Sequence, residues 1–460
     1  MRITAALVAA AWAGAAVAQL PAPAITPWRY TEDYRYLTDP AQRSGAWWES
    51  GKHVVLGSNA TLSTGAELRF RHERYRNNAF GGAAVPDESY TLYRFLPYAA
   101  LDVGAQLRAF AQLNVTDSNR SQASIGPVDR TGNELLQGFV QVSTPAGGDG
   151  QWTLRGGRQV LAYGSERLVS VRYGPNVMRA FDGGVLSWQS RDLRVDALAT
   201  RPVRNGLESF DDHADRRRRL WGLYATWNQP GQLAGTGLDV YYLGVSNRNA
   251  AYDQGSGAET RNTIGARHFG TRNRWGWDIE GIYQYGSFAG ARATGWSLAS
   301  DIRYTFKDGR FSPRLGVKAA VISGDRDPAD PRLQTLNVLF PKGKYFGEAG
   351  LIGPANLINL HPTLSLDLGG GWSLSSAAIF YWRQSLADGV YGVSGNLLRS
   401  AGDSRSRYIG TQADLVLGWE VSRQLGVEVA YSVFRPGGFI TATGHAETVH
   451  FIGLEALWRY

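Results

Sequence analysis

One pattern repeats along almost the whole chain, over residues 62–460: apolar and polar residues alternate in segments of about eight to thirteen positions. Side chains of a β-strand point to opposite faces with period two, so each segment predicts a strand between an apolar and a polar medium. Residues 297–307 show the pattern clearly. One face carries Leu298, Ser300, Ile302, Tyr304 and Phe306, and the other carries Ala299, Asp301, Arg303, Thr305 and Lys307.

The two ends of the chain indicate where such strands would lie. Residues 1–18 read as a signal peptide, with Arg2 before an apolar, alanine-rich run and a small-residue cleavage site at 16–18. The last alternating segment runs to the final residue and places Trp458 and Tyr460 on its apolar face. We interpret these two aromatic residues as an outer-membrane assembly signal for the barrel assembly machinery. The ends therefore favour a closed transmembrane β-barrel in the outer membrane of a Gram-negative bacterium.

Composition removes several classes of function. The chain has no cysteine, which excludes disulfide scaffolds, thiol catalysis and cysteine-bound metals. After the signal peptide, no run of eighteen apolar residues predicts a membrane-spanning helix. We expect no cofactor, no metal and no nucleic-acid partner.

Eighteen strands are predicted, and the connections between them alternate between tight turns and long loops. This order is typical of outer-membrane barrels with short periplasmic turns and long extracellular loops, whereas a soluble β-sandwich, the alternative, shares only the period-two pattern. Barrels of sixteen to eighteen strands leave an aqueous channel. The predicted strands are 61–75, 90–102, 104–116, 134–144, 151–159, 181–189, 191–200, 217–228, 236–247, 261–271, 274–288, 293–307, 311–322, 356–368, 372–384, 407–421, 424–435 and 446–460.

Residues 19–60 do not alternate and contain Trp28, Trp47 and Trp48. We predict a periplasmic N-terminal extension that packs near the mouth of a barrel formed by residues 61–460. The alternative is a loosely ordered tail.

Several local motifs resemble the alginate export family of outer-membrane barrels. They are RQVLAYGS at 158–165, RLVS at 167–170, GPNV at 174–177, FDG at 181–183, SGDRDP at 323–328, LFPKGKYFGE at 339–348, GPANLINLHP at 353–362 and YWR at 381–383. The resemblance implies an eighteen-stranded monomeric porin and, in the founding members, export of an anionic exopolysaccharide. The alginate secretin carries a long insertion in its last periplasmic turn, whereas this chain has only residues 422–424 there. This departure weakens the transfer of the alginate substrate more than that of the fold.

Charge on the predicted luminal face is nearly balanced. The acids and bases therefore predict a ladder of cross-strand ion pairs rather than a basic wall. The bases are Arg69, Arg71, Arg108, Arg155, Arg194, Arg267, Arg303, Arg314, Lys318, Arg383 and Arg459, and the acids are Glu67, Glu73, Asp102, Asp196, Asp239, Asp278, Glu280, Asp301, Asp367, Asp414, Glu420, Glu428 and Glu455.

The segment 158–179 is a better candidate for a selectivity element. It carries four arginines against the single acid Glu166 and is rich in apolar residues, so we expect it to fold into the lumen and narrow the channel. The alternative is an ordered cap on the outer rim. Guanidinium groups suit recognition of carboxylates. The predicted pore-lining set is Arg158, Arg167, Arg172, Arg179, Arg69, Arg155, Arg303 and Asp301, with Arg383 and Arg326 added from the family motifs.

Two further charged groups lie near predicted extracellular loops. The arginine run 216–219 could bind lipopolysaccharide phosphates or form a solvated loop end. Asp325, Asp327 and Asp330 could suggest calcium, but the interleaved arginines favour salt bridges within the loop, and no EF-hand pattern is present.

These features predict a channel for anionic saccharides or other small anions, working as a monomer in lipid and lipopolysaccharide. The first alternative is a general or uptake porin without anion selectivity. The second is a barrel-based hydrolase, which would need a nucleophile beside a base; none of the seven histidines stands in a spacing with Ser or Asp that indicates one.

Overall fold

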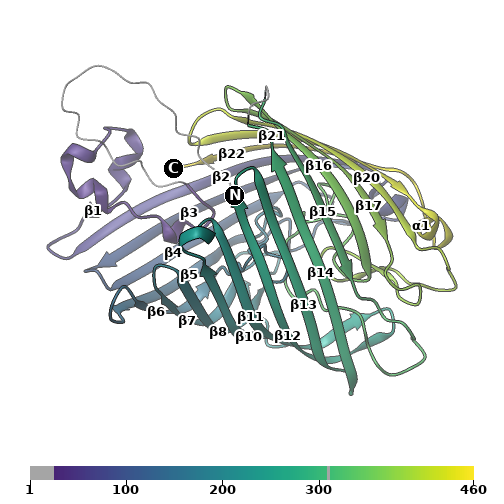
Figure 1. Ribbon diagram of the computed structural model, residues 1–460. Helices are drawn as coiled ribbons and strands as arrows, with labels where there is room; N and C mark the ends of the chain where they lie inside the picture. Colours follow the sequence, from purple (N-terminus) through teal and green to yellow (C-terminus); the bar gives the residue numbers. More distant parts are fainter. Residues whose placement is uncertain (1–24, 308–310) are drawn as a thin grey trace.

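The computed structural model describes residues 25–307 and 311–460. Within these residues, eighteen strands pair with their neighbours in chain order and close into one antiparallel barrel (Figure 1). The predicted fold class is therefore confirmed, and the soluble sandwich is wrong. The predicted signal peptide, residues 1–18, lies outside the described residues.

All eighteen predicted strands are present, and two of them, β6 and β7, begin and end at the predicted residues. The barrel strands are β2 (Ala60–Arg76), β3 (Glu88–Val103), β4 (Leu107–Ser118), β5 (Gly132–Pro145), β6 (Gln151–Gln159), β7 (Phe181–Gln189), β8 (Leu193–Arg204), β10 (Arg218–Asn228), β11 (Thr236–Tyr252), β12 (Gly255–Arg272), β13 (Trp275–Phe288), β14 (Ala291–Thr305), β15 (Arg314–Ile322), β16 (Leu357–Gly369), β17 (Trp372–Trp382), β20 (Tyr408–Glu420), β21 (Leu425–Pro436) and β22 (Val449–Arg459).

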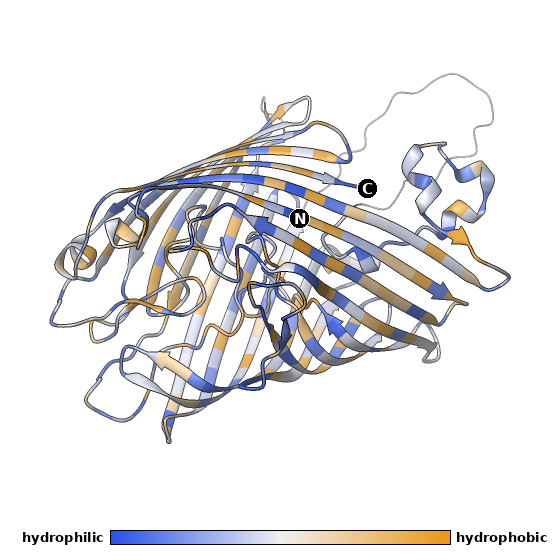
Figure 2. Cartoon of the chain, turned by 180° about the vertical axis from the view of Figure 1, so that it is seen from behind, coloured by the Kyte–Doolittle hydropathy of each residue, from blue (hydrophilic) through white to orange (hydrophobic). Residues whose placement is uncertain are grey.

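The first and last barrel strands close the sheet. β2 pairs with β22 in an antiparallel register that runs from Glu67 opposite Arg459 to Arg76 opposite His450. Along each strand, apolar and polar residues alternate (Figure 2). On β14, Leu298 and Ile302 are 56% and 41% exposed on the outer face, whereas Ala299, which points inward, is 3% exposed. The barrel thus presents an apolar outer surface to lipid.

Tight turns and long connections lie at opposite ends of the barrel. Two residues join β16 to β17 at one end, whereas residues 323–356 join β15 to β16 at the other. The long connections contain the short strands β9 (His213–Ala214), β18 (Val390–Tyr391) and β19 (Leu397–Arg399), the turn η5 (Asn78–Gly81) and the helix α1 (Gly438–Ala442). No described helix is long and apolar enough to cross a membrane. In barrels of this kind the long loops face the cell exterior.

The N-terminal segment packs at the tight-turn end, beside Tyr460. Arg29 donates a hydrogen bond to the Tyr460 carbonyl oxygen over 2.5 Å, and the Trp47 ring stacks on Trp458 with centroids 6.0 Å apart. This segment contains the short elements η1 (Arg29–Thr31), η2 (Arg35–Thr38), η3 (Pro40–Gln42), η4 (Trp47–Gly51) and β1 (Val54–Val55). A further short element, η6 (Gly231–Leu233), lies in the turn between β10 and β11 at the same end of the barrel. The described part of the predicted extension therefore contacts the barrel mouth.

Candidate pore constriction

Two long connections turn into the barrel and pair with each other. We call residues 160–180, between β6 and β7, the arginine loop, and residues 323–356, between β15 and β16, the long loop. The Ser170 amide donates to the Phe340 carbonyl over 3.0 Å, and the Phe340 amide donates to the Leu168 carbonyl over 2.8 Å. Val169 and Phe340 form a parallel bridge. The two loops therefore form one hydrogen-bonded unit.

Arginines of the barrel wall hold one end of the arginine loop. Arg69 on β2 donates to the carbonyl oxygens of Tyr173, Gly174 and Pro175 over 3.2, 2.9 and 2.9 Å. Arg94 on β3 donates to the carbonyls of Tyr173 and Pro175 over 3.0 and 3.1 Å. Arg69, predicted to line the pore, is 1% exposed and serves as an anchor for loop backbone.

The other end of the arginine loop reaches the far wall. Arg167 donates to Asp278 and Glu280 on β13 over 3.1 and 2.7 Å, and to the Tyr345 hydroxyl over 2.7 Å. In the closed order of eighteen strands, β13 lies about halfway round the barrel from β2 and β3. The arginine loop therefore crosses the lumen, as the sequence predicted.

A cavity of about 500 Å³ lies between the two inward loops and β2. Two of its basic groups are neutralised by acids that also line it, because Arg71 contacts Glu73 at 2.5 Å and Lys344 contacts Glu348 at 2.7 Å. Its lining also includes Arg172 and Arg179, together with apolar side chains such as Phe80, Leu351 and Leu398. The basic charge that remains comes mainly from the arginine loop.

Arg172 and Arg179 have no ion pair within residues 25–307 and 311–460. Both lie deep in the barrel, with part of each side chain open to the cavity. The Nε of Arg172 and the Nη1 of Arg179 are buried without a hydrogen-bond partner. Burial lowers the pKa of Arg172 to about 10, and burial together with the nearby Arg172 and Arg218 charges lowers the pKa of Arg179. Both guanidinium groups would gain from a bound anion.

The backbone at this pair is also unusual. Arg172 has φ +53°, in the left-handed region that few residues other than glycine adopt. Such a conformation costs about 1–3 kcal/mol and persists only where surrounding contacts impose it. The anchors on Tyr173, Gly174 and Pro175, directly after Arg172, supply those contacts.

The family model described as alginate export matches residues 60–453. The chain belongs to the alginate export family. No curated protein sequence matches it. Its fold is that of outer-membrane porins, which are channels. It is similar to crystal structures of Pseudomonas aeruginosa OccK2 (OpdF) in complex with glucuronate (11% identity, TM-score 0.56, 86% of this chain and 97% of that one), OpdO (14%, 0.56, 87% and 97%) and OccK11 (OpdR; 14%, 0.51, 86% and 95%).

In this alginate export family member, most luminal charges of the wall are paired. Arg267 contacts Asp239 and Asp278 at 2.7 Å each, and Arg108 contacts Asp102 at 2.6 Å. Two of the predicted pore-lining residues, Arg303 and Asp301, lie 3.8 Å apart. Some of these ion pairs join neighbouring strands, as Arg267 does with Asp239 and Asp278, and others join residues of one strand, such as Arg303 and Asp301.

Among the residues that the structure describes, Arg155 forms no ion pair with an acid, and neutral groups contact its guanidinium instead. It donates to the Gln141 side-chain oxygen over 3.1 and 2.8 Å, and its guanidinium lies 4.2 Å from the Tyr30 ring centre and 4.7 Å from that of Phe139. Tyr30 belongs to the N-terminal segment. Arg155 thus joins that segment to the wall.

Arg158 does not lie where the sequence analysis placed it. β6 continues to Gln159, so alternation puts Arg158 on the face opposite Arg155, together with the outward, 56% exposed Leu154. Arg158 pairs with Asp182 on β7 at 2.8 Å. The assignment of Arg158 to the pore is therefore corrected: this residue joins two strands on the outer face.

The two arginines taken from family motifs also lie away from the cavity. Arg383 is fully buried, and its guanidinium donates to the carbonyls of Leu386, Asp388, Ser404 and Ser406 over 2.5–3.2 Å. It holds the connection between β17 and β20 together rather than lining a pore. Arg326 is exposed in the long loop.

Acidic residues of the long loop form contacts within the protein. Arg332 pairs with Asp330 at 2.6 Å, in agreement with the predicted salt bridges. The Asp325 amide donates to Asp388, and the Asp325 carboxylate accepts from the Gln334 amide over 3.0 Å. Burial raises the pKa of Asp325 to about 6, and the nearby Asp388 charge adds to the shift. Asp325 and Asp388 are therefore two acids buried side by side.

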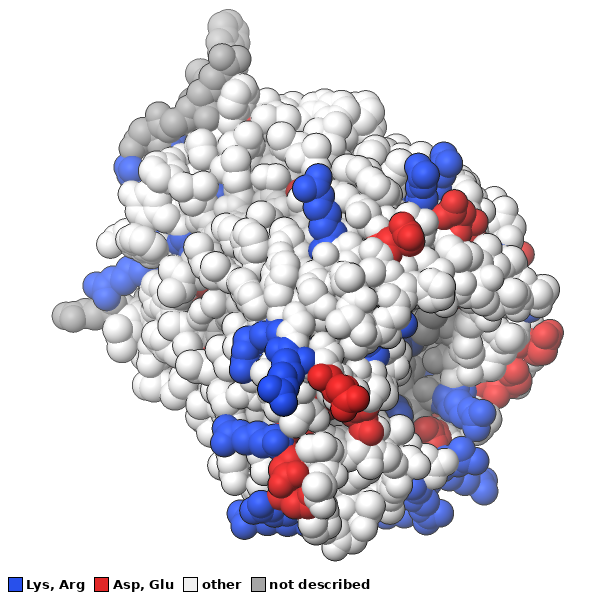
Figure 3. Space-filling view, turned by 90° about the vertical axis from the view of Figure 1, so that its right-hand side faces the viewer, with Lys and Arg blue, Asp and Glu red and all other residues white. Residues whose placement is uncertain are grey.

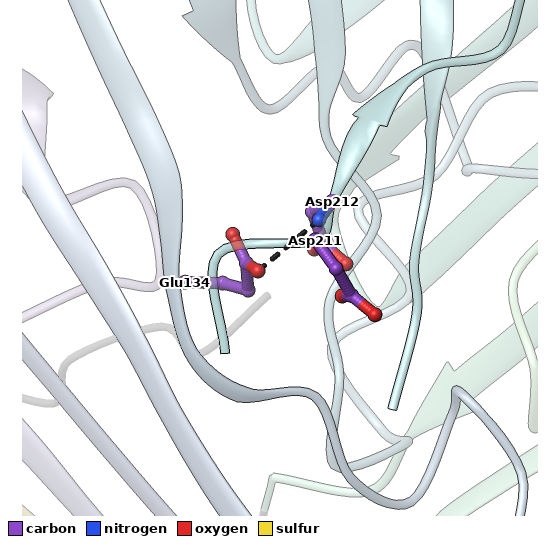
Figure 4. A group of neighbouring side chains, drawn as sticks. All are labelled: Glu134, Asp211 and Asp212. Atoms are coloured by element: carbon purple, nitrogen blue, oxygen red, sulfur yellow. Dashed lines mark hydrogen bonds between the residues drawn. The ribbon is translucent and has the colours of Figure 1, made fainter. Parts of the chain in front are cut away.

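Three other acids, Glu134, Asp211 and Asp212, place carboxylate oxygens within 4.8 Å of one another (Figure 4). Glu134 accepts from the Asp212 amide over 3.1 Å, and the Asp212 carboxylate accepts from Thr131 and Asn205 over 3.0 and 2.6 Å. Hydrogen-bond donors of the surrounding loops therefore satisfy these acids. The cluster joins β5 to the connection that follows β8.

The sequence analysis missed two parts of the constriction. One is the inward course of the long loop, whose length of more than thirty residues was a usable signal. The other is Asn176, fully buried, whose amide donates to the carbonyls of Tyr93, Asp117 and Asp129 over 2.9, 3.3 and 2.8 Å. The motif GPNV at 174–177 contains Asn176, but the role of its side chain was not predictable, because its three acceptors come from distant strands and loops.

Proposed function

We propose that this outer-membrane channel passes anionic saccharides or other small carboxylates by diffusion, and that Arg172 and Arg179 supply its preference for anions. The observation that carries the proposal is the pair of buried guanidinium groups without acid partners at the 500 Å³ cavity. Figure 3 looks onto the loop end of the barrel, where basic and acidic side chains lie beside one another near the edge.

The chemistry of the pair suits a passing carboxylate. A guanidinium group presents several N–H donors in a plane and binds a carboxylate through two parallel hydrogen bonds. Two such groups close together, away from bulk water, attract an anion more strongly than exposed ones would. Rings and alkyl groups in the same cavity, such as Phe80 and Leu351, would contact the apolar face of a sugar ring.

Two comparisons support acidic sugars as the solute class. The family is described as alginate export, and alginate is an anionic polysaccharide. The OccK2 crystal structure contains glucuronate, a sugar carboxylate. We propose the outer membrane of a Gram-negative bacterium as the location, with the single barrel as the conducting unit.

The proposal is tested in planar bilayers. In a potassium chloride gradient, the parent channel should show a reversal potential that favours chloride, and added glucuronate should block the current more than neutral glucose does. Arg172→Gln with Arg179→Gln should weaken both effects. The matched control, Arg326→Gln, removes an arginine that lies outside the cavity and should change neither.

Equal permeability to the two ions in the parent channel would contradict the anion preference and leave a general porin. That outcome has a physical basis in the wall, where Arg108, Arg267 and their acids neutralise each other.

A further inference from the structure

We infer that the outer rim of β8, β10 and β11 binds the phosphate groups of lipopolysaccharide. Four arginines form the site, Arg201, Arg217, Arg219 and Arg248, and we call them the rim arginines. They include two members of the run 216–219, and the fold adds Arg201 and Arg248 from the neighbouring strands.

Strand register brings the rim arginines together. The last ladder pair between β8 and β10 is Thr200 with Leu220, and Arg201 and Arg219 are the next residues toward the long-loop end. On the other side of β10, the Arg248 amide donates to the Arg217 carbonyl over 3.0 Å. The Arg201 guanidinium also donates to the Arg216 carbonyl over 3.2 Å. The four side chains thus start from adjacent backbone positions.

Alternation directs Arg201 and Arg219 outward. On β10, Arg219 shares the face of Leu223, which is 53% exposed, and Arg217 lies in the turn directly before this strand. On β8, Arg201 follows Ala197, the ladder partner of Leu223, and on β11 Arg248 is exposed at an irregularity of the ladder between Asn247 and Ala250. Arg201 and Arg219 therefore continue the lipid-facing band at its extracellular edge, where the headgroups lie, with Arg217 and Arg248 beside them.

Acids lie near the patch, with Asp182 opposite Arg201 in the ladder and Asp215 accepting from the Arg217 amide. No rim arginine has an ion pair within the described part of the chain; the nearby Asp215 lies 4.0 Å from Arg218, and Asp182 pairs with Arg158. Like charges on adjacent strands repel and destabilise the sheet unless an anion lies between them. Arginine binds phosphate oxygens in bidentate geometry, so a phosphate would relieve this repulsion.

The position of the patch selects a lipid over a free ion. An apolar band directly below the rim arginines includes Leu223 and Val240. A ligand with phosphates on its headgroup and acyl chains beneath them contacts both surfaces at once. Lipid A, the membrane anchor of lipopolysaccharide, has both phosphates and acyl chains, whereas inorganic phosphate has no acyl chain to contact the apolar band.

The test uses the full barrel refolded in detergent without lipopolysaccharide, and follows its heat unfolding by the mobility shift of folded barrels on gels. Bisphosphorylated lipid A should raise the unfolding midpoint of the parent. Dephosphorylated lipid A and inorganic phosphate should not. Arg217→Gln with Arg219→Gln should remove about half of the increase, since each cation near an anionic headgroup contributes similarly.

The control variant, Arg191→Gln with Arg272→Gln, removes two exposed arginines at the tight-turn end and should keep the full increase. If the first variant fails to refold, Arg201→Gln with Arg248→Gln tests the same patch. If lipid A raised the unfolding midpoint equally in the rim and control variants, the rim arginines would not be the binding site. An increase with inorganic phosphate alone would indicate a general anion effect, and one with dephosphorylated lipid would indicate acyl-chain binding; either overturns the proposal.

Discussion

In the barrel wall buried charges lie beside opposite charges, whereas in the inward loops they lie beside like charges. In the wall, Arg94 lies 2.7 Å from Glu67, and Arg267 lies 2.7 Å from both Asp239 and Asp278. In the loops, like charges are buried side by side: Arg172 with Arg179 at the cavity, and Asp325 with Asp388 in the connections near the rim.

This difference in pairing suggests that the wall charges serve stability and the loop charges serve selectivity. Paired charges keep a polar lumen without favouring either sign of ion, because each cation is offset by an acid nearby. Unpaired charges are costly in the empty protein and gain when a partner of opposite sign arrives. The loops therefore hold the groups that respond to solute or to protons, while the wall holds them in place.

The largest expected effect comes from reversing the charges of the arginine pair. Arg172→Glu with Arg179→Glu should turn a preference for chloride into one for potassium. A unit charge about 10 Å from an ion contributes about 1.7 kcal/mol at an effective dielectric constant of about 20. That is more than tenfold in the permeability ratio. The reversal potential measures it, and Arg326→Glu is the control of equal charge change.

The reverse experiment removes one acid from the paired charges of the wall. Asp278 contacts both Arg167 and Arg267, so Asp278→Asn should leave each guanidinium with one acid, Glu280 or Asp239, and add one uncompensated positive charge to this part of the wall. We expect a loss of stability of about 3 kcal/mol, seen as a lower heat-unfolding midpoint, and a stronger preference for chloride. If the variant unfolded and conducted like the parent, the distinction between wall and loops would fail.

Arg383 tests whether an arginine without an acid partner affects selectivity when backbone carbonyls bind its guanidinium. Its guanidinium is surrounded by four carbonyl oxygens, so Arg383→Gln should leave the reversal potential unchanged. The carbonyls left without a donor cost about 1–3 kcal/mol and should loosen residues 383–407. Limited proteolysis should then cleave that connection faster than in the parent. A shift of selectivity instead would place Arg383 in the conducting path.

The smallest effect concerns the acidic pair. The pKa of Asp325 is raised to about 6, so its protonated form is favoured in the folded loops. This contribution to stability is present below pH 4 and is lost as the pH rises through about 6. Protection factors of the amides of residues 323–335, which correct for the intrinsic pH dependence of hydrogen exchange, should therefore be higher at pH 5 than at pH 7.5, by about 1 kcal/mol after allowance for solvent screening.

Asp325→Asn supplies the control for the pH effect. An asparagine amide does not titrate, so the variant should show the same protection factors at both pH values. Equal protection of the parent loop at both values, with the variant unchanged, would mean that the acids do not repel.

Strands were predictable from sequence because alternation is a local signal. β6 and β7 match their predicted bounds, and the same rule carried to Gln159 would have placed Arg158 outside. Arg172 and Arg179 were found because four arginines against one acid is a visible imbalance. Their lack of partners was not predictable, since it depends on which wall acids already bind Arg71 and Arg167.

The four carbonyls around the Arg383 guanidinium could not be predicted from the sequence, for a related reason. Its acceptors are backbone carbonyls within residues 386–406, a connection whose sequence shows no long alternating segment. Alternation assigns a side chain to a face, and it fails where a strand ends and a loop closes over the residue.

The seam between β2 and β22 sets the order in which this molecule can form. It joins the first barrel strand to the last, so the contacts that close the sheet have the greatest sequence separation in the chain. Both edge strands stay open to wrong pairing until residue 459 arrives. The contacts of Arg29 and Trp47 with Tyr460 and Trp458 join segments from both ends of the chain. They hold the N-terminal segment against β22, the second strand of the seam.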